Sequence, residues 1–180
     1  MIEPAGPTIR RAIVSDAMLL AELGARTFSE TFAADNNPED MTAYLATSFN
    51  PEKQATELAD PLCTFLIAEI DGTAVGYAML RGGGEAVSGV NCENSIELVR
   101  FYVSQEWHRC GIGNALMQAC VNESRRQDYR TLWLGVWEHN GRAREFYRRW
   151  NFRDVGEHIF HLGSDAQNDI LMERSLSDPY

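Results

Sequence analysis

The stretch that decides the fold is residues 98–116, LVRFYVSQEWHRCGIGNAL. Its first part, Leu98–Val103, is rich in Val, Phe and Tyr, and this composition predicts a β-strand. Two glycines, Gly111 and Gly113, follow, and from Leu116 onward apolar residues recur at helical spacing. A strand, a glycine loop and a helix start in succession favour a bound anion, because loop amides and the helix dipole attract negative charge. We therefore predict a cradle for a pyrophosphate at this loop.

The glycine loop alone is a weak signal. His108 and Arg109 add positive charge beside it. The lysine-bearing phosphate loop needs GxxxxGK followed by Ser or Thr, a run that the sequence lacks, and the dinucleotide fingerprint needs Gly or Ala where Leu116 stands. A tight strand-to-helix turn explains Gly111 and Gly113 equally well at this point.

Length and charge bound the class of protein. The 180 residues suffice for one domain, residues 1–180, with a real core. The formal net charge of −10 and a pI near 4.8 argue against binding to nucleic acid or to an anionic membrane surface. They favour small cationic partners, although many cytosolic proteins are simply acidic.

Cysteine usage and the start of the chain indicate a reducing, cytoplasmic compartment. The four cysteines are Cys63, Cys92, Cys110 and Cys120. Their irregular spacing contains no CxxC pair, so we expect neither a metal site nor a disulfide framework. Met1–Thr8 lacks the basic start and apolar core of a signal peptide, and no apolar run approaches membrane-spanning length.

Hydrophobic periodicity predicts a mixed sheet with helices on both faces, an α/β or α+β layered domain. The expected strands are Thr8–Ala12, Thr64–Ile70, Thr73–Leu80, Ser95–Val103, Thr131–Trp137, Val155–Leu162 and Ile170–Leu176. The expected helices are one that Ser15 or Asp16 caps and that runs to Phe32, two short ones after Asn37 and Asn50, one from the glycine loop to about Gln127, and one over Asn140–Trp150. Arg81–Asn94, with three successive glycines, is expected to be a flexible loop.

Local signals set several of these boundaries. Asn37 and Asn50 each precede a proline, which places a capping side chain before the first helical residue. Asp71-Gly72 is a strong two-residue hairpin turn. Asn151 suits the left-handed position that often ends a helix.

A second motif follows the strand Thr131–Trp137. Residues 138–147 read EHNGRAREFY and contain the pattern N-x-x-A-x-x-F-Y from Asn140 to Tyr147. Together with Val103 and the loop HRCGIG of residues 108–113, this pattern resembles the GNAT superfamily of N-acetyltransferases. The resemblance covers nearly the whole chain in its order of elements. It implies a mostly antiparallel central sheet with splayed central strands, acetyl-CoA as co-substrate, and no metal.

A narrower resemblance lies in the second half of the chain. The segments LGVW at 134–137, NF at 151–152, GEHIFHLG at 156–163 and DILM at 169–172 are similar to the PaiA-type polyamine N-acetyltransferases. This subgroup implies spermidine or spermine as the acceptor.

The superfamily resemblance implies a set of cofactor-binding residues. They are Phe101, Tyr102, Val103, His108, Arg109, Cys110, Gly111, Ile112, Gly113, Asn114, Asn140 and Tyr147. The backbone N–H of Val103 would meet the thioester carbonyl, and Asn140 would bond the pantetheine arm or cap a helix. The superfamily usually has Gln or Arg at position 108, Gly at 109 and a basic residue at 110. The backbone amides of the loop therefore matter more for a phosphate than its side chains.

Two residues are candidates for proton transfer. Tyr147 is implied as the general acid, because a phenol with a pKa near 10 stays protonated at neutral pH and can protonate a leaving thiolate. Its alternative role is a half-buried aromatic side chain. Glu97, on the central strand, is a candidate base that acts through water, and its alternative is an exposed strand carboxylate.

The acceptor is less defined than the cofactor. Glu30, Asp35, Glu39 and Asp40 could hold a polycation, or could form a solvated face. His158 and His161 lie on one strand but on opposite faces, so we propose no metal there. Alternative functions are a protein or antibiotic amine acetyltransferase and a non-catalytic acetyl-CoA sensor. The terminal strands allow a homodimer through edge pairing.

Overall fold

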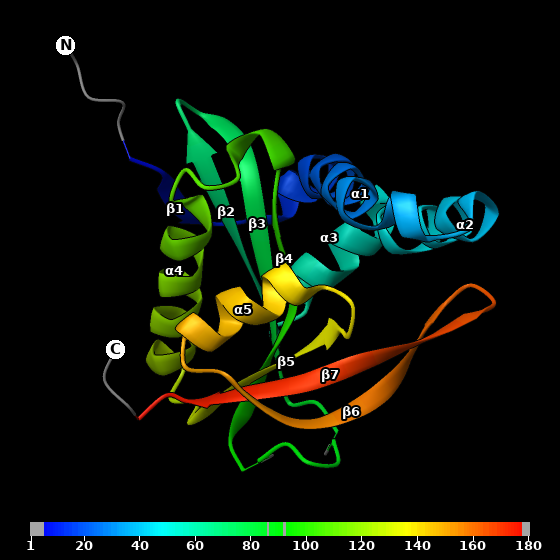
Figure 1. Cartoon of the computed structure of the whole chain (residues 1–180). Helices are drawn as coiled ribbons and strands as arrows, with labels where there is room; N and C mark the ends of the chain where they lie inside the picture. The colour runs from blue at the N-terminus through cyan, green and yellow to red at the C-terminus, as the bar shows by residue number, and fades with distance from the viewer. Residues whose placement is uncertain (1–5, 86, 92, 178–180) are drawn as a thin grey trace.

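A seven-stranded sheet forms the centre of the molecule (Figure 1). The computed structural model describes residues 6–85, 87–91 and 93–177. In the sheet order β1-β2-β3-β4-β5-β7-β6, every neighbouring pair is antiparallel except β4 and β5. The strands are β1 Thr8–Arg11, β2 Cys63–Ile70, β3 Thr73–Gly82, β4 Ser95–Val103, β5 Thr131–Trp137, β6 Arg153–Leu162 and β7 Asp165–Ser175. This architecture confirms the predicted fold class.

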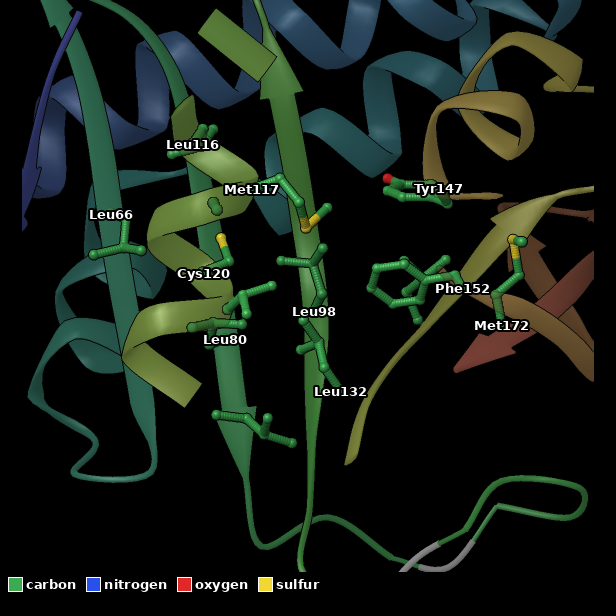
Figure 2. Packing of buried hydrophobic residues seen from close by; sticks show 14 of the residues in the cluster. Leu66, Leu80, Leu98, Leu116, Met117, Cys120, Leu132, Tyr147, Phe152 and Met172 are labelled. Atoms are coloured by element: carbon green, nitrogen blue, oxygen red, sulfur yellow. The ribbon is translucent and has the colours of Figure 1, made fainter. Parts of the chain in front are cut away.

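Helices cover both faces of the sheet. They are α1 Ala17–Phe32, α2 Pro38–Ser48, α3 Pro51–Ala59, α4 Ile112–Arg126 and α5 Gly141–Arg149. Leu20 and Leu23 of α1 pack with Phe65 and Met79 on one side, which we name the α1 face. The helices α4 and α5 lie on the other side, the α4 face. Figure 2 shows sheet leucines there packed against Leu116 and its neighbours on α4, in the larger apolar core.

Most local predictions from the sequence are confirmed. The side chain of Asn37 accepts from the backbone N–H of Glu39 at 2.8 Å, and Asn50 accepts from Lys53 at 2.8 Å. Asp71 and its neighbouring glycine have positive φ values, as a tight hairpin turn requires. These local signals therefore set where α2 and α3 begin and where the β2–β3 hairpin turns.

Two predictions about boundaries are wrong. Strand β7 begins at Asp165 rather than Ile170, because residues 166–169 are mostly polar and show no apolar alternation although they pair with β6. Strand β3 continues through Gly82, so it takes the first two residues of the expected loop. Residues 86 and 92 of that loop lie outside the described part of the chain.

The central strands β4 and β5 pair only at their beginnings. Three registered pairs join them, from Ser95 with Thr131 to Glu97 with Trp133. Beyond these pairs the two parallel strands separate. Strand β4 also carries a bulge, because Met79 pairs with Arg100 whereas the next residue of β3 pairs with Leu98. The extra residue bends β4 and increases its twist.

The bulge places two consecutive β4 side chains on the α1 face. One of them, Arg100, donates to both carboxylate oxygens of Glu57 on α3, at 2.7 and 3.1 Å. Arg100 also donates to Gln54 at 3.2 Å and lies over the ring of Phe49. The Arg100 and Glu57 side chains are only 11% and 9% exposed, so this ion pair fixes α3 against the bulged strand.

We predict that Glu57→Gln lowers the free energy of unfolding by about 3 kcal/mol, because it leaves Arg100 buried without a counter-charge. Urea denaturation followed by circular dichroism measures the change. Glu52→Gln, at an exposed position of the same helix, is the control and should change stability by less than about 0.5 kcal/mol. Equal effects of the two substitutions would contradict a structural role for the buried ion pair.

Candidate active site

A cleft of about 1320 Å³ lies where β4 and β5 separate. Of the thirteen positions predicted to bind the cofactor or act in catalysis, eleven line this cleft. Those that line it are Glu97, Phe101, Tyr102, Val103, His108, Arg109, Gly111, Gly113, Asn114, Asn140 and Tyr147.

The remaining two positions, Cys110 and Ile112, do not line the cleft. The Cys110 side chain is exposed, and its Sγ lies 3.7 Å from the carbonyl oxygen of His108. Ile112 is buried in the apolar core. At Ile112 the side chain is therefore closed to a ligand, and the exposed side chain of Cys110 lies outside the cleft lining.

The glycine loop ends in a helix start that presents unpaired amides. Gly111, the N-cap of α4, has a φ of 83°, and Arg109 has a φ of 67°. The first intrahelical bond runs from Ala115 N–H to the Gly111 carbonyl, so the amides of residues 112–114 have no partner within the helix. Such amides, with the helix dipole behind them, favour an anion. The left-handed backbone at Arg109 also explains why glycine is usual at that position.

His108 connects the loop to the end of β4. Its Nε2 lies 2.8 Å from the carbonyl oxygen of Val103, and its Nδ1 lies 3.1 Å from a guanidinium nitrogen of Arg142. Because a guanidinium only donates, Nδ1 accepts, and we infer that Nε2 carries the proton and donates to Val103. The imidazole thus holds the loop, β4 and α5 together.

Three contacts hold helix α5 in place: a cap at its own first turn, a ring stack on β4 and a hydrogen bond to α4. Asn140 caps the helix, since its Oδ1 accepts from the backbone N–H of Ala143 at 3.1 Å. The rings of Phe146 and Phe101 stack with centroids 5.6 Å apart. Trp150 Nε1 donates to Asn114 Oδ1 at 3.1 Å. The capping alternative for Asn140 is therefore confirmed.

Tyr147 lies between α5 and the separated strands. Its ring packs near Phe101 and Phe152, and it is 8% exposed. In Figure 2 the hydroxyl points away from α5 toward β4. Burial raises the pKa of Tyr147 far above its ordinary value, with a smaller contribution from Cys120. The hydroxyl therefore stays protonated at neutral pH.

The register of β3 and β4 determines where the Val103 amide points. Ser104 N–H donates to the Val75 carbonyl at 2.8 Å, so these two residues form a hydrogen-bonded pair. In an antiparallel ladder such pairs alternate with non-bonded ones, and the next pair, Gly76 with Val103, is non-bonded. The N–H of Val103 consequently faces away from β3, toward the gap between β4 and β5.

Glu97 lies at the closed end of the cleft. It pairs with Arg81 in β3 and with Trp133 in β5, where the central strands are still joined. Burial raises the pKa of Glu97, and the nearby charge of Arg81 partly offsets this.

The α1 face supplies an aromatic wall that the sequence did not reveal. Its rings are Phe28, Phe32, Tyr44, Phe49, Tyr102, Trp137 and Phe160. Tyr102 belongs to this wall, with its ring 6.2 Å from Phe28, and so lies on the opposite side of the cleft from Phe101. Phe28 and Phe32 have the spacing of an ordinary buried helix face, so periodicity alone could not distinguish wall from core.

The predicted acidic cluster divides in the structure. Glu30 lines the cleft and accepts from the backbone N–H of Gln105 at 2.9 Å. Asp40 instead accepts from the Ser164 hydroxyl at 3.1 Å in the β6–β7 turn. Asp35 and Glu39 do not line the cleft. Two residues that were not predicted as site residues, His158 and Asp169, do line it.

Within residues 6–85, 87–91 and 93–177, no group of three or more His, Cys, Asp or Glu side chains could hold a metal ion. In the same part of the chain, none of the helices has the length and apolar character needed to cross a membrane.

Comparison with known proteins identifies the family. The Acetyltransferase (GNAT) family profile matches residues 25–152. The chain belongs to this family. It is 34% identical over 154 residues to an uncharacterized N-acetyltransferase of Lactobacillus delbrueckii subsp. lactis, covering 86% of this chain and 88% of the relative. A relative from Mycobacterium tuberculosis is 32% identical over 163 residues, covering 91% and 99%.

Two further similarities are more distant. The PaiA N-acetyltransferase of Thermoplasma acidophilum, solved in complex with coenzyme A, superimposes with a TM-score of 0.79 at 22% identity, covering 95% of this chain and 99% of that one. An aminoglycoside N(6')-acetyltransferase of Stenotrophomonas maltophilia is 26% identical over 175 residues, covering 96% and 95%. The protein is thus an acyltransferase of the N-acetyltransferase type.

We predict that His108→Ala weakens coenzyme A binding about 10-fold, because it removes two hydrogen bonds that hold the loop against β4 and α5. Isothermal titration calorimetry with coenzyme A measures the dissociation constant. His161→Ala, at an exposed position of β6 outside the cleft, is the control. An unchanged dissociation constant in His108→Ala would show that the imidazole does not support the loop.

Proposed function

We propose that the cleft binds acetyl-CoA and transfers its acetyl group to a primary amine of a small molecule. The polyamines spermidine and spermine are the acceptors that we favour. The observation that carries the proposal is a convergence in one cleft. A helix N-terminus with unpaired amides, a strand amide facing the gap at Val103, and a protonated hydroxyl at Tyr147 all meet there.

The cofactor lies along the α4 face in this proposal. Its pyrophosphate binds the amides of residues 112–114, and Arg109 adds positive charge at the loop. The pantetheine arm follows the edge of β4 that β5 leaves unpaired, where backbone groups can bond its amides. The side-chain N–H₂ group of Asn140 remains available to that arm, because only its oxygen serves as the helix cap.

Acetyl transfer then proceeds by direct attack. Val103 N–H polarises the thioester carbonyl and stabilises the oxyanion that forms when the neutral amine attacks. As the C–N bond forms and the C–S bond breaks, Tyr147 protonates the leaving thiolate. The acetylated nitrogen loses a proton, and solvent returns one to Tyr147. Glu97, acting through water, is the proposed base that removes the first proton from the incoming ammonium.

In this mechanism the ionisation of Glu97 determines how activity falls at low pH. A base works only when deprotonated, so activity should fall as the pH drops through its pKa. Since burial raises that pKa, the loss begins at a higher pH than for an exposed glutamate.

The other side of the cleft suits a cationic acceptor. Its aromatic wall offers ring faces to an ammonium group, and Glu30, Glu97 and Asp169 bring carboxylates. The net charge of −10 attracts cations over longer distances. The sequence resemblance of residues 134–137, 156–163 and 169–172 to the PaiA-type polyamine N-acetyltransferases supports a polyamine. The aminoglycoside N(6')-acetyltransferase relative supports a second candidate, because an aminoglycoside is also a polycation.

A panel of amines with a thiol-release assay tests the proposal. It contains spermidine, spermine, an aminoglycoside and a peptide with a free N-terminus. We expect release of coenzyme A thiol with the polyamines above the rate of hydrolysis. Release with the aminoglycoside or peptide alone would overturn the choice of acceptor. Tight cofactor binding without release for any amine would indicate a sensor instead of an enzyme.

We predict that Tyr147→Phe lowers kcat about 100-fold and changes the dissociation constant of coenzyme A by less than about 2-fold, because only the acidic proton is removed. Steady-state kinetics and calorimetry measure the two quantities. Tyr129→Phe, outside the cleft, is the matched control. Turnover unchanged in Tyr147→Phe would exclude this hydroxyl as the acid.

A further inference from the structure

Gly135 lies in the floor of the cleft and leaves space there because it has no side chain. Its neighbours in β5, Leu134 and Val136, are buried on the α4 face, whereas Gly135 is exposed toward the α1 face. A Cβ placed on Gly135 would lie 3.1 Å from Cε1 of His158 and 3.4 Å from Oδ2 of Asp169. The two side chains therefore converge on the space above this glycine.

The strand register explains this convergence. Asp169 of β7 pairs with Trp137 of β5 on one side and with His158 of β6 on the other. Side chains of directly paired residues lie on the same face of a sheet. Asp169 and His158 thus share the α1 face with the aromatic wall, on the floor of the same cleft as Val103 and Tyr147.

The surroundings of Asp169 leave its carboxylate available to a cationic ligand. Burial raises the pKa of this carboxyl, and the facing His158 partly offsets the effect. Among the ion pairs of the described residues, none joins Asp169 to an arginine or lysine. A partly desolvated carboxylate without such a partner favours binding of a cation.

The position of Asp169 along the sheet also differs from that of Glu97. Glu97 pairs with Trp133, whereas Asp169 pairs with Trp137, four residues further along β5. Four residues of strand span about 13 Å, so Asp169 lies about that much nearer to the open end of the cleft than Glu97 does. Val103 lies at this open end, where β4 stops. Trp137 stands beside Asp169, and its ring lies 6.2 Å from that of Phe32. A carboxylate and aromatic rings together favour an ammonium group.

We propose that Asp169, with His158 beside it above Gly135, binds the ammonium group of the acceptor and positions it at the Val103 end of the cleft. This inference rests on the proposed function and adds the residues that select the acceptor. Asp169 accepts hydrogen bonds from the ammonium, and a ring nitrogen of His158 accepts another. Trp137 covers the ammonium from the side. Glu97 remains the base and acts on this nitrogen through a chain of waters, because about 13 Å of strand separates its register from that of Asp169.

Asp169→Asn tests the proposal, because it keeps the shape of the side chain and removes its charge. With spermidine, or with the best acceptor of the panel, we expect KM for the amine to rise about 10-fold. KM for acetyl-CoA and kcat should change less than about 3-fold. Glu157→Gln is the matched control, since Glu157 precedes His158 on β6 and so lies on the opposite face. The control should leave KM for the amine within 2-fold of the wild type.

Gly135→Ala is a second, independent test. Its methyl group enters the space between His158 and Asp169, so we expect KM for the amine to rise while the dissociation constant of coenzyme A stays the same. Thermal unfolding of each variant separates loss of the subsite from loss of the fold. An amine KM within 2-fold of the wild type in Asp169→Asn, or an equal rise in Glu157→Gln, would overturn the proposal.

Calorimetry distinguishes failure of this inference from failure of the proposed function. Spermidine is titrated into the complex with coenzyme A, which needs no turnover. If the wild type binds spermidine but releases no thiol, the proposed function fails, and weaker binding to Asp169→Asn still supports the subsite. If the wild type turns over spermidine and Asp169→Asn binds it equally well, the subsite alone is wrong.

Discussion

The site depends on two parallel strands that stop pairing. After the pair Glu97 and Trp133, β4 and β5 separate, so the backbone groups on their facing edges have no partner in the sheet. Unpaired backbone groups away from water are costly, and the surrounding elements limit this cost. His108 bonds the Val103 carbonyl, while the stacked rings of Phe101 and Phe146 fill part of the gap. The cleft is therefore a property of the backbone, stabilised by a few side chains.

The two faces of the sheet divide the chemistry between them. On the α4 face an apolar core holds α4 and α5, which present amides and the Tyr147 hydroxyl to the cleft. On the α1 face, the ion pair between Arg100 and Glu57 holds α3 against the bulged strand beside the aromatic wall. Because each wall has its own core, a substitution on one face should leave the other largely intact.

The sequence predicted the individual helices and strands well, but it predicted less well how they come together to form the cleft. The bounds of β4 and β5 agree with the prediction because their aromatic and β-branched residues form unbroken runs. The start of β7 was missed since residues 166–169 are mostly polar and show no apolar alternation. The family resemblance implied the separation of the central strands, but neither this separation nor the role of Tyr102 in the aromatic wall has a local signature, because both follow from pairing between distant segments. Asp169 was overlooked for the same reason.

The side chain of Arg109 affects how this acidic protein binds a ligand with several negative charges. A residue with a side chain costs about 1 kcal/mol or more in the left-handed conformation, where glycine is unstrained. In return, the loop gains a guanidinium on the wall of the cleft. Against a net charge of −10, one guanidinium hardly changes the attraction of cations to the whole molecule, but it does act on an anion bound within about 8 Å, the screening length at physiological ionic strength. A strained turn thus lets one surface attract ligands of opposite sign at different distances.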